Sequence, residues 1–528
     1  MARISVDEKL WSYMMLDTLL KPVLDSDIGL TNDAQEIDRR NAALKALFAE
    51  KVLFERCKNL NDKINQLQEL IRIHEMDAYQ LFSVLPLFQE IRLCMDAMCK
   101  GIAASAAALQ APDLVELKTL CSSILQEEFK PDFDWRWNQA LSGLEDLHSL
   151  HYRFYLNSDL QVTHYALLSL NRKPFKARNA LWQRGNTPRR DMEVLAHCTE
   201  ARENMHHQAE GFAAKGVGLP SFSAVRSART LFRSEVIHAR LPDLSRVLTA
   251  AIPSLYSKQT QTVWSMMREL GRRILLRMAV QGQRMQFWIS AVTLMEKLQA
   301  AKLPWHFARI RPAPERVCTA QAAYHPAAAL ALQQPERLVY NKIDLTSQGA
   351  ILLLTGANGG GKTTYLRTVG AVQLFFQLGL PVPAQQAEIS PVDSIVAAFS
   401  LKEDTGLSSG KLGQELLAVR EALAGLQGES LVLFNEPITG TSISECCLIS
   451  QEVLAVLKVL QARCIWVTHL FTLLDQTAGI NERLPGAKVG YMHISETDAY
   501  RVAFGRGPDS SHAMTGYNRT VLDNGTHR

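Results

Sequence analysis

The first 300 residues of this chain place apolar side chains at the spacing of amphipathic helices. Residues 37–51 carry an apolar face opposite a charged one, and residues 60–73 repeat that pattern. Residues 264–303 are periodic and contain few helix breakers, with Gly271 and Gly282 as the weak points. They predict a continuous helix about 60 Å long. We interpret such a helix as a lever or a coiled arm, because it is longer than one core requires.

The pattern changes at residue 304, where short apolar runs begin to alternate with helical runs. The predicted strands are 317–320, 338–341, 351–354, 431–434, 464–467 and 488–491, and the predicted helices are 363–378, 411–426 and 444–461. Strands that alternate with helices are typical of a parallel sheet covered by helices. We therefore predict an α + α/β protein, with a helical core and lever domain in residues 1–303 and a sheet domain in residues 304–528.

Composition adds constraints on the class of protein. The chain has 528 residues, of which 47% are hydrophobic and 21% charged, as in a globular protein of two to four domains. The apolar runs are too short for a membrane span, and the N-terminal residues carry no secretory pattern. Nine cysteines without a C-x-x-C pair argue against a zinc site and a disulfide framework. We expect a cytoplasmic location and no contact with membranes.

Charge is distributed unevenly along the chain. Residues 338–528 hold 14 Lys and Arg against 17 Asp and Glu, whereas the preceding 337 residues hold 43 against 36. Residues 171–190 contain Pro174, Gly185 and Pro188 and predict an exposed basic loop. This loop either lies along DNA phosphates or is a solvated basic loop, and both interpretations stay open. Its candidate DNA-binding residues are Lys176, Arg178, Arg184, Arg189 and Arg190.

The strongest chemical signal is a glycine-rich segment, residues 356–363, with the sequence GANGGGKT. It matches the whole pattern G-x-x-x-x-G-K-[ST] between a predicted strand and a predicted helix. Its backbone N–H groups would bind the phosphates of ATP, Lys362 would reach the β- and γ-phosphates, and Thr363 would ligate Mg²⁺. The alternative is a glycine-rich turn before an ordinary helix. The predicted phosphate-binding residues are Gly356, Gly359, Gly360, Gly361, Lys362 and Thr363.

Two later strands end in polar residues, at the edge where ligands bind to parallel sheets. Asn435 follows the run 431–434 and would hold Mg²⁺ through water, and Glu436 is placed to orient or deprotonate the attacking water. His469 follows the run 464–467 and could sense the γ-phosphate by a hydrogen bond. A solvated glutamate and a structural histidine are the alternatives. We take Glu436 and His469 as the candidate catalytic residues.

These motifs resemble the MutS family of ABC-type ATPases, which includes the DNA mismatch-repair proteins. The segments TGANGGGKTTYLRTVG, VPAQQAEISPVDSIVAAFS, NEPITGTS and VTHLFTL are similar to family motifs, and the agreement covers roughly residues 322–517. Tyr324-His325-Pro326 looks like the family's R-H-P segment. The resemblance implies that residues 304–528 form the ATPase domain, and it adds three candidate nucleotide-binding residues, Asn358, Thr364 and Tyr340.

The chain departs from the family pattern at several positions. The signature serine that would touch the γ-phosphate of a partner subunit is replaced by Leu412, and the usual aspartate that serves Mg²⁺ is replaced by Asn435. The register places Leu338 at the expected adenine-stacking aromatic, with Tyr340 as a substitute. We find no Phe-x-Glu wedge near the N-terminus, and we expect a short member that lacks the mismatch-recognition domain. These departures predict slow hydrolysis.

The resemblance implies a homodimer through the ATPase domains, with ATP at the interface, in which hydrolysis is coupled to binding of double-stranded or branched DNA. The predicted process is DNA mismatch repair, or a related repair or recombination process. An alternative is a nucleotide-gated scaffold with weak or no ATPase activity that binds a protein partner. A small-molecule kinase is a third possibility, which the Thr468-His469 segment and the GTS sequence after Glu436 disfavour.

Overall fold

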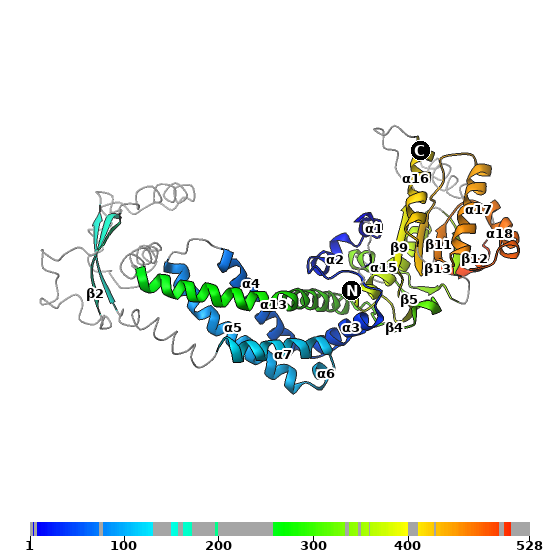
Figure 1. Cartoon of the computed structure of the whole chain (residues 1–528). Helices are drawn as coiled ribbons and strands as arrows, with labels where there is room; N and C mark the ends of the chain where they lie inside the picture. Colours follow the sequence, from blue (N-terminus) through cyan, green and yellow to red (C-terminus); the bar gives the residue numbers. More distant parts are fainter. Residues whose placement is uncertain are drawn as a thin grey trace, which may run out of the picture. The chain divides into compact units, whose positions relative to one another are not determined.

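The computed structural model of the chain divides into two compact units, and Figure 1 shows its elements in sequence colours. The first unit comprises residues 1–58, 100–118 and 280–528, and the second comprises residues 59–99 and 119–279. The structure describes residues 4, 8–72, 78–129, 149–156, 162–171, 196–198, 257–332, 337–346, 350–357, 359–399, 410–426, 429–495 and 501–507. The domain boundary between residues 303 and 304 stays a prediction.

Four long helices contribute residues to both units: α4 (Lys51–Arg72), α5 (Ala78–Ala104), α7 (Pro112–Glu127) and α13 (Ser257–Ala300). Helix α13 has 44 residues, so it extends for about 66 Å and confirms the long helix predicted from the sequence. Gly271 and Gly282 lie inside it without interrupting it. At Gly271 an added Cβ would lie 2.4 Å from Ile71 Cδ1 of α4, so this glycine lets α4 and α13 pack closely.

The second unit also contains a small antiparallel sheet. Its strands are β1 (Ser149–Leu156), β2 (Val162–Asn171) and β3 (Ala196–Cys198), in the order β1-β2-β3. The sequence predicted a helical domain over residues 1–303 and did not predict these strands. The sequence SLHYRFYL of β1 is rich in aromatic residues and in part alternates apolar with polar residues, which favours a strand.

The first unit is built around a six-stranded, mostly parallel sheet, as the alternation of strands and helices predicts. Its strands are β7 (Ile351–Thr355), β9 (Ser394–Phe399), β10 (Ser430–Asn435), β11 (Arg463–Val467), β12 (Val489–Ser495) and β13 (Arg501–Phe504). Their order is β13-β12-β7-β11-β10-β9, and only β13 runs antiparallel to its neighbour. Every residue of β7 and β11 is buried, because helices cover both faces of the sheet.

Helices pack on both faces of this sheet: α15 (Lys362–Leu378), α16 (Lys411–Ala424), α17 (Ile443–Val459) and α18 (Phe471–Arg483). On one face Val432, Phe434 and Trp466 share a core with residues of α16, α17 and α18. On the other face α15 contacts β10 and β11, and an added Cβ at Gly370 would lie 2.9 Å from Leu433 Cδ1. Figure 1 shows α15 and the pair α17 and α18 on opposite sides of the sheet.

The first unit also contains a second, four-stranded sheet with the order β4-β8-β5-β6. Its strands are β4 (Arg309–Ile310), β5 (Cys318–Ala323), β6 (Asn341–Asp344) and β8 (Gln386–Ile389). The shorter helices are α1 (Glu8–Tyr13), α2 (Asp17–Leu24), α3 (Ala34–Ala49), α6 (Ala106–Leu109), α14 (Pro326–Ala331) and the 3₁₀ helix η3 (Ala313–Glu315). Among the helices in the described ranges, none has the length and apolar character of a membrane span.

Candidate nucleotide-binding site

The glycine-rich loop connects β7 to α15 and is open where a phosphate would lie. Gly359 and Gly361 have φ angles of 76° and 96°, which side chains other than glycine rarely adopt. A Cβ added at either position would meet no atom within 4 Å, so both face open space. Gly361 is the N-cap of α15, whose first N–H groups and dipole favour an anion. The loop therefore has the geometry of an anion-binding site.

Lys362 occupies the first position of α15 and points back to the loop. Its Nζ atom donates hydrogen bonds to the carbonyl oxygens of Gly356 and Ala357, at 2.8 and 2.9 Å. The residue is 6% exposed, and burial lowers the pKa of its amine while the carboxylate of Glu436 opposes this shift. The ammonium group thus lies at the mouth of the loop, next to the carbonyls at its start.

Thr363 lies next to the end of β10. Its Oγ1 atom donates a hydrogen bond to Asn435 Oδ1 at 3.2 Å. Hydroxyl and amide oxygens are ligands that suit Mg²⁺, so this pair fits a magnesium ion whose other ligands are phosphate oxygens and water. Neither oxygen carries a full charge. Within the described ranges, no group of three or more His, Cys, Asp or Glu side chains could hold a metal ion.

Glu436 and His469 face each other at the same edge of the sheet. The Oε1 atom of Glu436 lies 3.1 Å from His469 Nε2. The close approach of His469 lowers the pKa of the Glu436 carboxyl, burial opposes this shift, and Lys362 and Lys411 reinforce it. Glu436 is therefore an ionised carboxylate at neutral pH, with a shape and charge suited to accepting a proton from a bound water.

The backbone at Glu436 is unusual. Its φ angle is 51°, in the left-handed region that is uncommon for residues other than glycine. Its N–H donates to Val467 O at 3.0 Å, which joins the ends of β10 and β11. Such strained residues gather at functional sites, where the surrounding structure holds them in place.

Sequence reasoning missed the role of Glu415, a residue in the second turn of α16. Its side chain is 1% exposed. Glu415 Oε1 accepts a hydrogen bond from Thr439 Oγ1 at 2.7 Å, and Oε2 accepts from the N–H groups of Thr439 and Gly440 at 2.9 and 2.8 Å. No local pattern could have revealed these bonds, because they join residues 24 and 25 positions apart. They attach α16 to the loop that follows Glu436.

The signature segment begins α16, with Gly410 as its N-cap. Leu412, which the sequence resemblance predicts at the position of the family's serine, packs partly buried against the core beneath α16 and α17. Lys411 lies close enough to Glu436 to lower the pKa of its carboxyl. The first turn of α16 thus places a cation near Glu436 and an apolar side chain against the core.

The predicted adenine-side residue Tyr340 packs edge to face against Tyr324, with 5.8 Å between the ring centroids. The adjacent His325 is the N-cap of α14, where its Nδ1 accepts from Ala328 N at 3.1 Å and its Nε2 lies 2.7 Å from Met14 O. These bonds require the neutral tautomer that is protonated on Nε2. Thr364 is exposed in the first turn of α15. Contact of Tyr340 or Thr364 with a nucleotide stays a prediction.

Several candidate residues lie outside the described ranges. Asn358 is one of them. The same holds for every candidate DNA-binding residue of the basic segment: Lys176, Arg178, Arg184, Arg189 and Arg190. Their assignments stay predictions.

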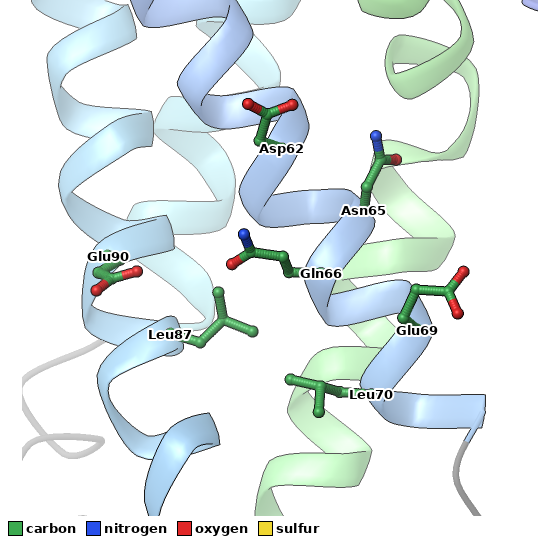
Figure 2. Close-up of a pocket in the computed structure, with 7 residues that line it drawn as sticks. All are labelled: Asp62, Asn65, Gln66, Glu69, Leu70, Leu87 and Glu90. Atoms are coloured by element: carbon green, nitrogen blue, oxygen red, sulfur yellow. The ribbon is translucent and has the colours of Figure 1, made fainter. Parts of the chain in front are cut away.

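The second unit contains a pocket of about 600 Å³ between residues of α4 and α5. Figure 2 shows its lining, which combines carboxylate and amide side chains with Leu70 and Leu87. Glu90 in this lining forms an ion pair with Lys63 at 2.7 Å, and Glu69 is 76% exposed. Its acidic groups are solvated or paired, so the pocket does not have the character of a built ligand site.

Comparison with known proteins agrees with this geometry. The family model for MutS domain V matches residues 352–512. DNA mismatch repair protein MutS of Granulibacter bethesdensis is 31% identical over 184 residues, which are 34% of this chain and 19% of that protein. The MutS protein of Chloroflexus aurantiacus is 28% identical over 244 residues, or 45% of this chain and 24% of that protein. That of Rickettsia prowazekii is 33% identical over 151 residues, or 28% and 17%.

The fold and the site are those of a mixed α/β protein with a mostly parallel sheet and a MutS domain V at residues 352–512. Residues 352–512 therefore match MutS domain V, and over part of its length the chain is similar to DNA mismatch repair proteins MutS. It matches between 17% and 24% of the length of these curated relatives.

Proposed function

We propose that this chain binds ATP with Mg²⁺, hydrolyses it slowly, and couples the nucleotide state to binding of DNA in mismatch repair or a related repair process. One observation carries the proposal. The open glycine loop, the Thr363–Asn435 hydrogen bond and the Glu436–His469 pair lie at one edge of a single parallel sheet. That edge is where ligands of open α/β sheets bind.

The assignment of roles follows from these positions. The backbone N–H groups of the loop would hold the phosphates, and Lys362 would leave its carbonyl partners to reach the β- and γ-phosphates. Thr363 would ligate Mg²⁺ directly and Asn435 through water. When bound, this ion would neutralise charge on the phosphates. Glu436 would orient and deprotonate the attacking water, and His469 would hold the Glu436 carboxylate in place.

Two features support slow turnover. Asn435 is neutral, so it adds no negative charge beside the proposed Mg²⁺ position. Leu412 packs against the core, where the resemblance places a serine of the family. Both changes weaken groups that act during hydrolysis, whereas the phosphate loop itself is complete. We therefore expect these departures to lower kcat for hydrolysis more than they weaken the affinity for ATP.

DNA as the second ligand is supported by the names of the relatives and by the basic segment 171–190. A homodimer through the ATPase domains, with ATP at the interface, is part of the same proposal. The runner-up is a nucleotide-gated scaffold that binds a protein partner. A cytoplasmic location stays a prediction.

The test measures nucleotide and DNA binding on the same sample. Fluorescence anisotropy with duplex, four-way-junction and mismatched DNA would be recorded with and without ATP and Mg²⁺, for wild type and for Lys362→Ala. The proposal predicts DNA affinity that changes with ATP in wild type and not in Lys362→Ala. A DNA affinity that does not change with ATP in either protein would contradict the coupling of nucleotide state to DNA binding. Absence of any DNA binding would favour the nucleotide-gated scaffold.

A further inference from the structure

The loop between β10 and α17 is short and is held at two points. At its start Glu436 bonds to Val467 O through its N–H and faces His469 through its carboxylate. Further along, before the Ser442 N-cap of α17, Thr439 and Gly440 bond to Glu415. Only Pro437 and Ile438 lie between, and both are buried. A displacement at one end of so short a segment is therefore transmitted to the other end.

Burying the Glu415 carboxylate carries a desolvation cost. A carboxylate in a buried position loses its hydration and must recover it through hydrogen bonds. Its three partners, the Oγ1 and N–H of Thr439 and the N–H of Gly440, are neutral donors. Hydrogen bonds to an ionised acceptor are stronger and shorter than those to a neutral one. The charge thus holds the loop more tightly than an amide could.

The loop and α16 are packed closely at Gly440. A Cβ added at Gly440 would lie 2.8 Å from Leu412 N and 3.0 Å from Glu415 Oε2. The backbone of the loop therefore rests directly on the first turns of α16. Gly440 permits this close approach, and the Glu415 carboxylate completes it.

The start of the loop needs such support. Glu436 has a left-handed φ angle of 51°, a conformation that persists only when neighbouring contacts enforce it. The hydrogen bond to Val467 O holds its N–H side. The Glu415 bonds hold the chain on its carbonyl side, three and four residues further along.

We propose that Glu415 is a positioning residue for Glu436. By holding Thr439 and Gly440, it maintains the left-handed turn at Glu436 and keeps that carboxylate beside His469. The inference rests on the proposed function, which gives Glu436 its part in hydrolysis. It also implies that a partner that shifts the start of α16 alters hydrolysis without touching the nucleotide.

The test uses three variants. Glu415→Gln retains the shape of the side chain but removes its charge, so the bonds from the N–H groups of Thr439 and Gly440 weaken and the Thr439 hydroxyl must accept from the amide. Thr439→Val removes one hydroxyl at nearly constant volume, and Thr439→Ser keeps that hydroxyl. We expect Glu415→Gln to lower kcat roughly tenfold to a hundredfold while the Kd for ATP stays within about twofold. Thr439→Val should lower kcat by less, and Thr439→Ser should retain the wild-type rate.

A crystal structure of Glu415→Gln gives a readout that does not depend on activity. We expect the distance between Glu436 Oε1 and His469 Nε2 to exceed about 4 Å, compared with 3.1 Å in the native chain. An unchanged distance, or an unchanged kcat in Glu415→Gln and Thr439→Val, would overturn the inference. If Glu415→Gln does not fold, the kcat comparison and a crystal structure of Thr439→Val decide the question.

A matched control separates positioning from stability. Asp113 is another buried carboxylate of the first unit, paired with Arg39 and Arg284. Asp113→Asn should lower the melting temperature without lowering kcat while the protein is folded. If wild type binds no ATP, the proposed function fails, and the Glu436–His469 distance in the variant still decides whether Glu415 positions Glu436.

Discussion

Thr363 Oγ1 donates a hydrogen bond to Asn435 Oδ1 across 3.2 Å, and this contact joins the helix after the glycine loop to the end of β10. Both oxygens are suitable for a magnesium shell, but neither carries a negative charge. The attraction for Mg²⁺ must then come from the phosphates of the nucleotide. This arrangement explains why we expect the chain to hold ATP better than it hydrolyses it.

Asn435→Asp tests this explanation directly. A carboxylate has nearly the same shape, can accept the same hydrogen bond from Thr363, and adds one negative charge beside the metal position. We expect the Mg²⁺ concentration that gives half-maximal hydrolysis to fall several-fold, and kcat to rise by roughly tenfold. Steady-state phosphate release at varied Mg²⁺ measures both. Asn435→Ser, which adds no charge, is the control, and an equal response of the two variants would count against the explanation.

Glu436→Gln should separate binding from chemistry. The amide keeps the size of the side chain but cannot accept a proton from water, so we expect hydrolysis to fall about a hundredfold or more. The Kd for ATP should change by less than about threefold, because the phosphates contact the glycine loop and Lys362. Single-turnover hydrolysis and equilibrium titration provide the two numbers. Rapid turnover in Glu436→Gln would remove this residue from the proposed mechanism.

The stability of the chain should depend on the ionisation of His325. Burial lowers the pKa of His325, the bond to Met14 O opposes this shift, and Arg367 reinforces it. Between the lowered native value and an unfolded value near about 6.5, the unfolded chain binds a proton that the native chain excludes. The free energy of unfolding should therefore fall as the pH drops through this window, and His325 should contribute no pH dependence above it.

Urea denaturation at several pH values checks this prediction. His325→Asn retains an N-cap acceptor for Ala328 N–H but does not titrate. Its stability should be lower than that of wild type at pH 8, and its pH dependence below about 6.5 should be weaker by up to one proton. Parallel curves for the two proteins would show that His325 makes no such contribution.

Neutralising the basic segment should weaken DNA binding in a salt-dependent way. If Arg184, Arg189 and Arg190 each contact a phosphate, their replacement by Gln should reduce the slope of log affinity against log salt by roughly 2.7. The exposed residues Arg420 and Lys488 lie in the range 304–528 and provide a control, because their replacement should leave the slope unchanged. Anisotropy titrations at two salt concentrations measure it, and an unaltered slope in the triple variant would exclude this segment from the DNA site.

The parallel sheet was largely predictable from the sequence, whereas the roles of the residues at its edge stay predictions. Strands β7, β10 and β11 are continuous apolar runs because both faces of the sheet are covered, and the polar residues that follow them mark its carboxyl edge. Helix α13 was predictable for a similar reason, since the helical spacing of its apolar residues continues through Gly271 and Gly282. In each case the signal lies within one element, where pattern and structure correspond directly.

Features that depend on contacts between elements were not accessible. The bonds from Thr439 and Gly440 to Glu415 form only once α16 packs on the loop, so spacing along the chain does not reveal them. The left-handed turn at Glu436 likewise depends on its neighbours. The strands β1 and β2 were missed for another reason. Their mixed aromatic and polar sequence lies between long helical patterns and carries no flanking motif.

The central claim is that the loop after β7 binds the phosphates of ATP, and thermal unfolding tests it most directly. With ATP and Mg²⁺ at about 100 times the Kd, wild type should gain about 2.7 kcal/mol of stability and melt several degrees higher. Lys362→Ala should show little of this shift, although its melting temperature without nucleotide stays close to that of wild type. A melting temperature of wild type that does not respond to ATP and Mg²⁺ would contradict the account.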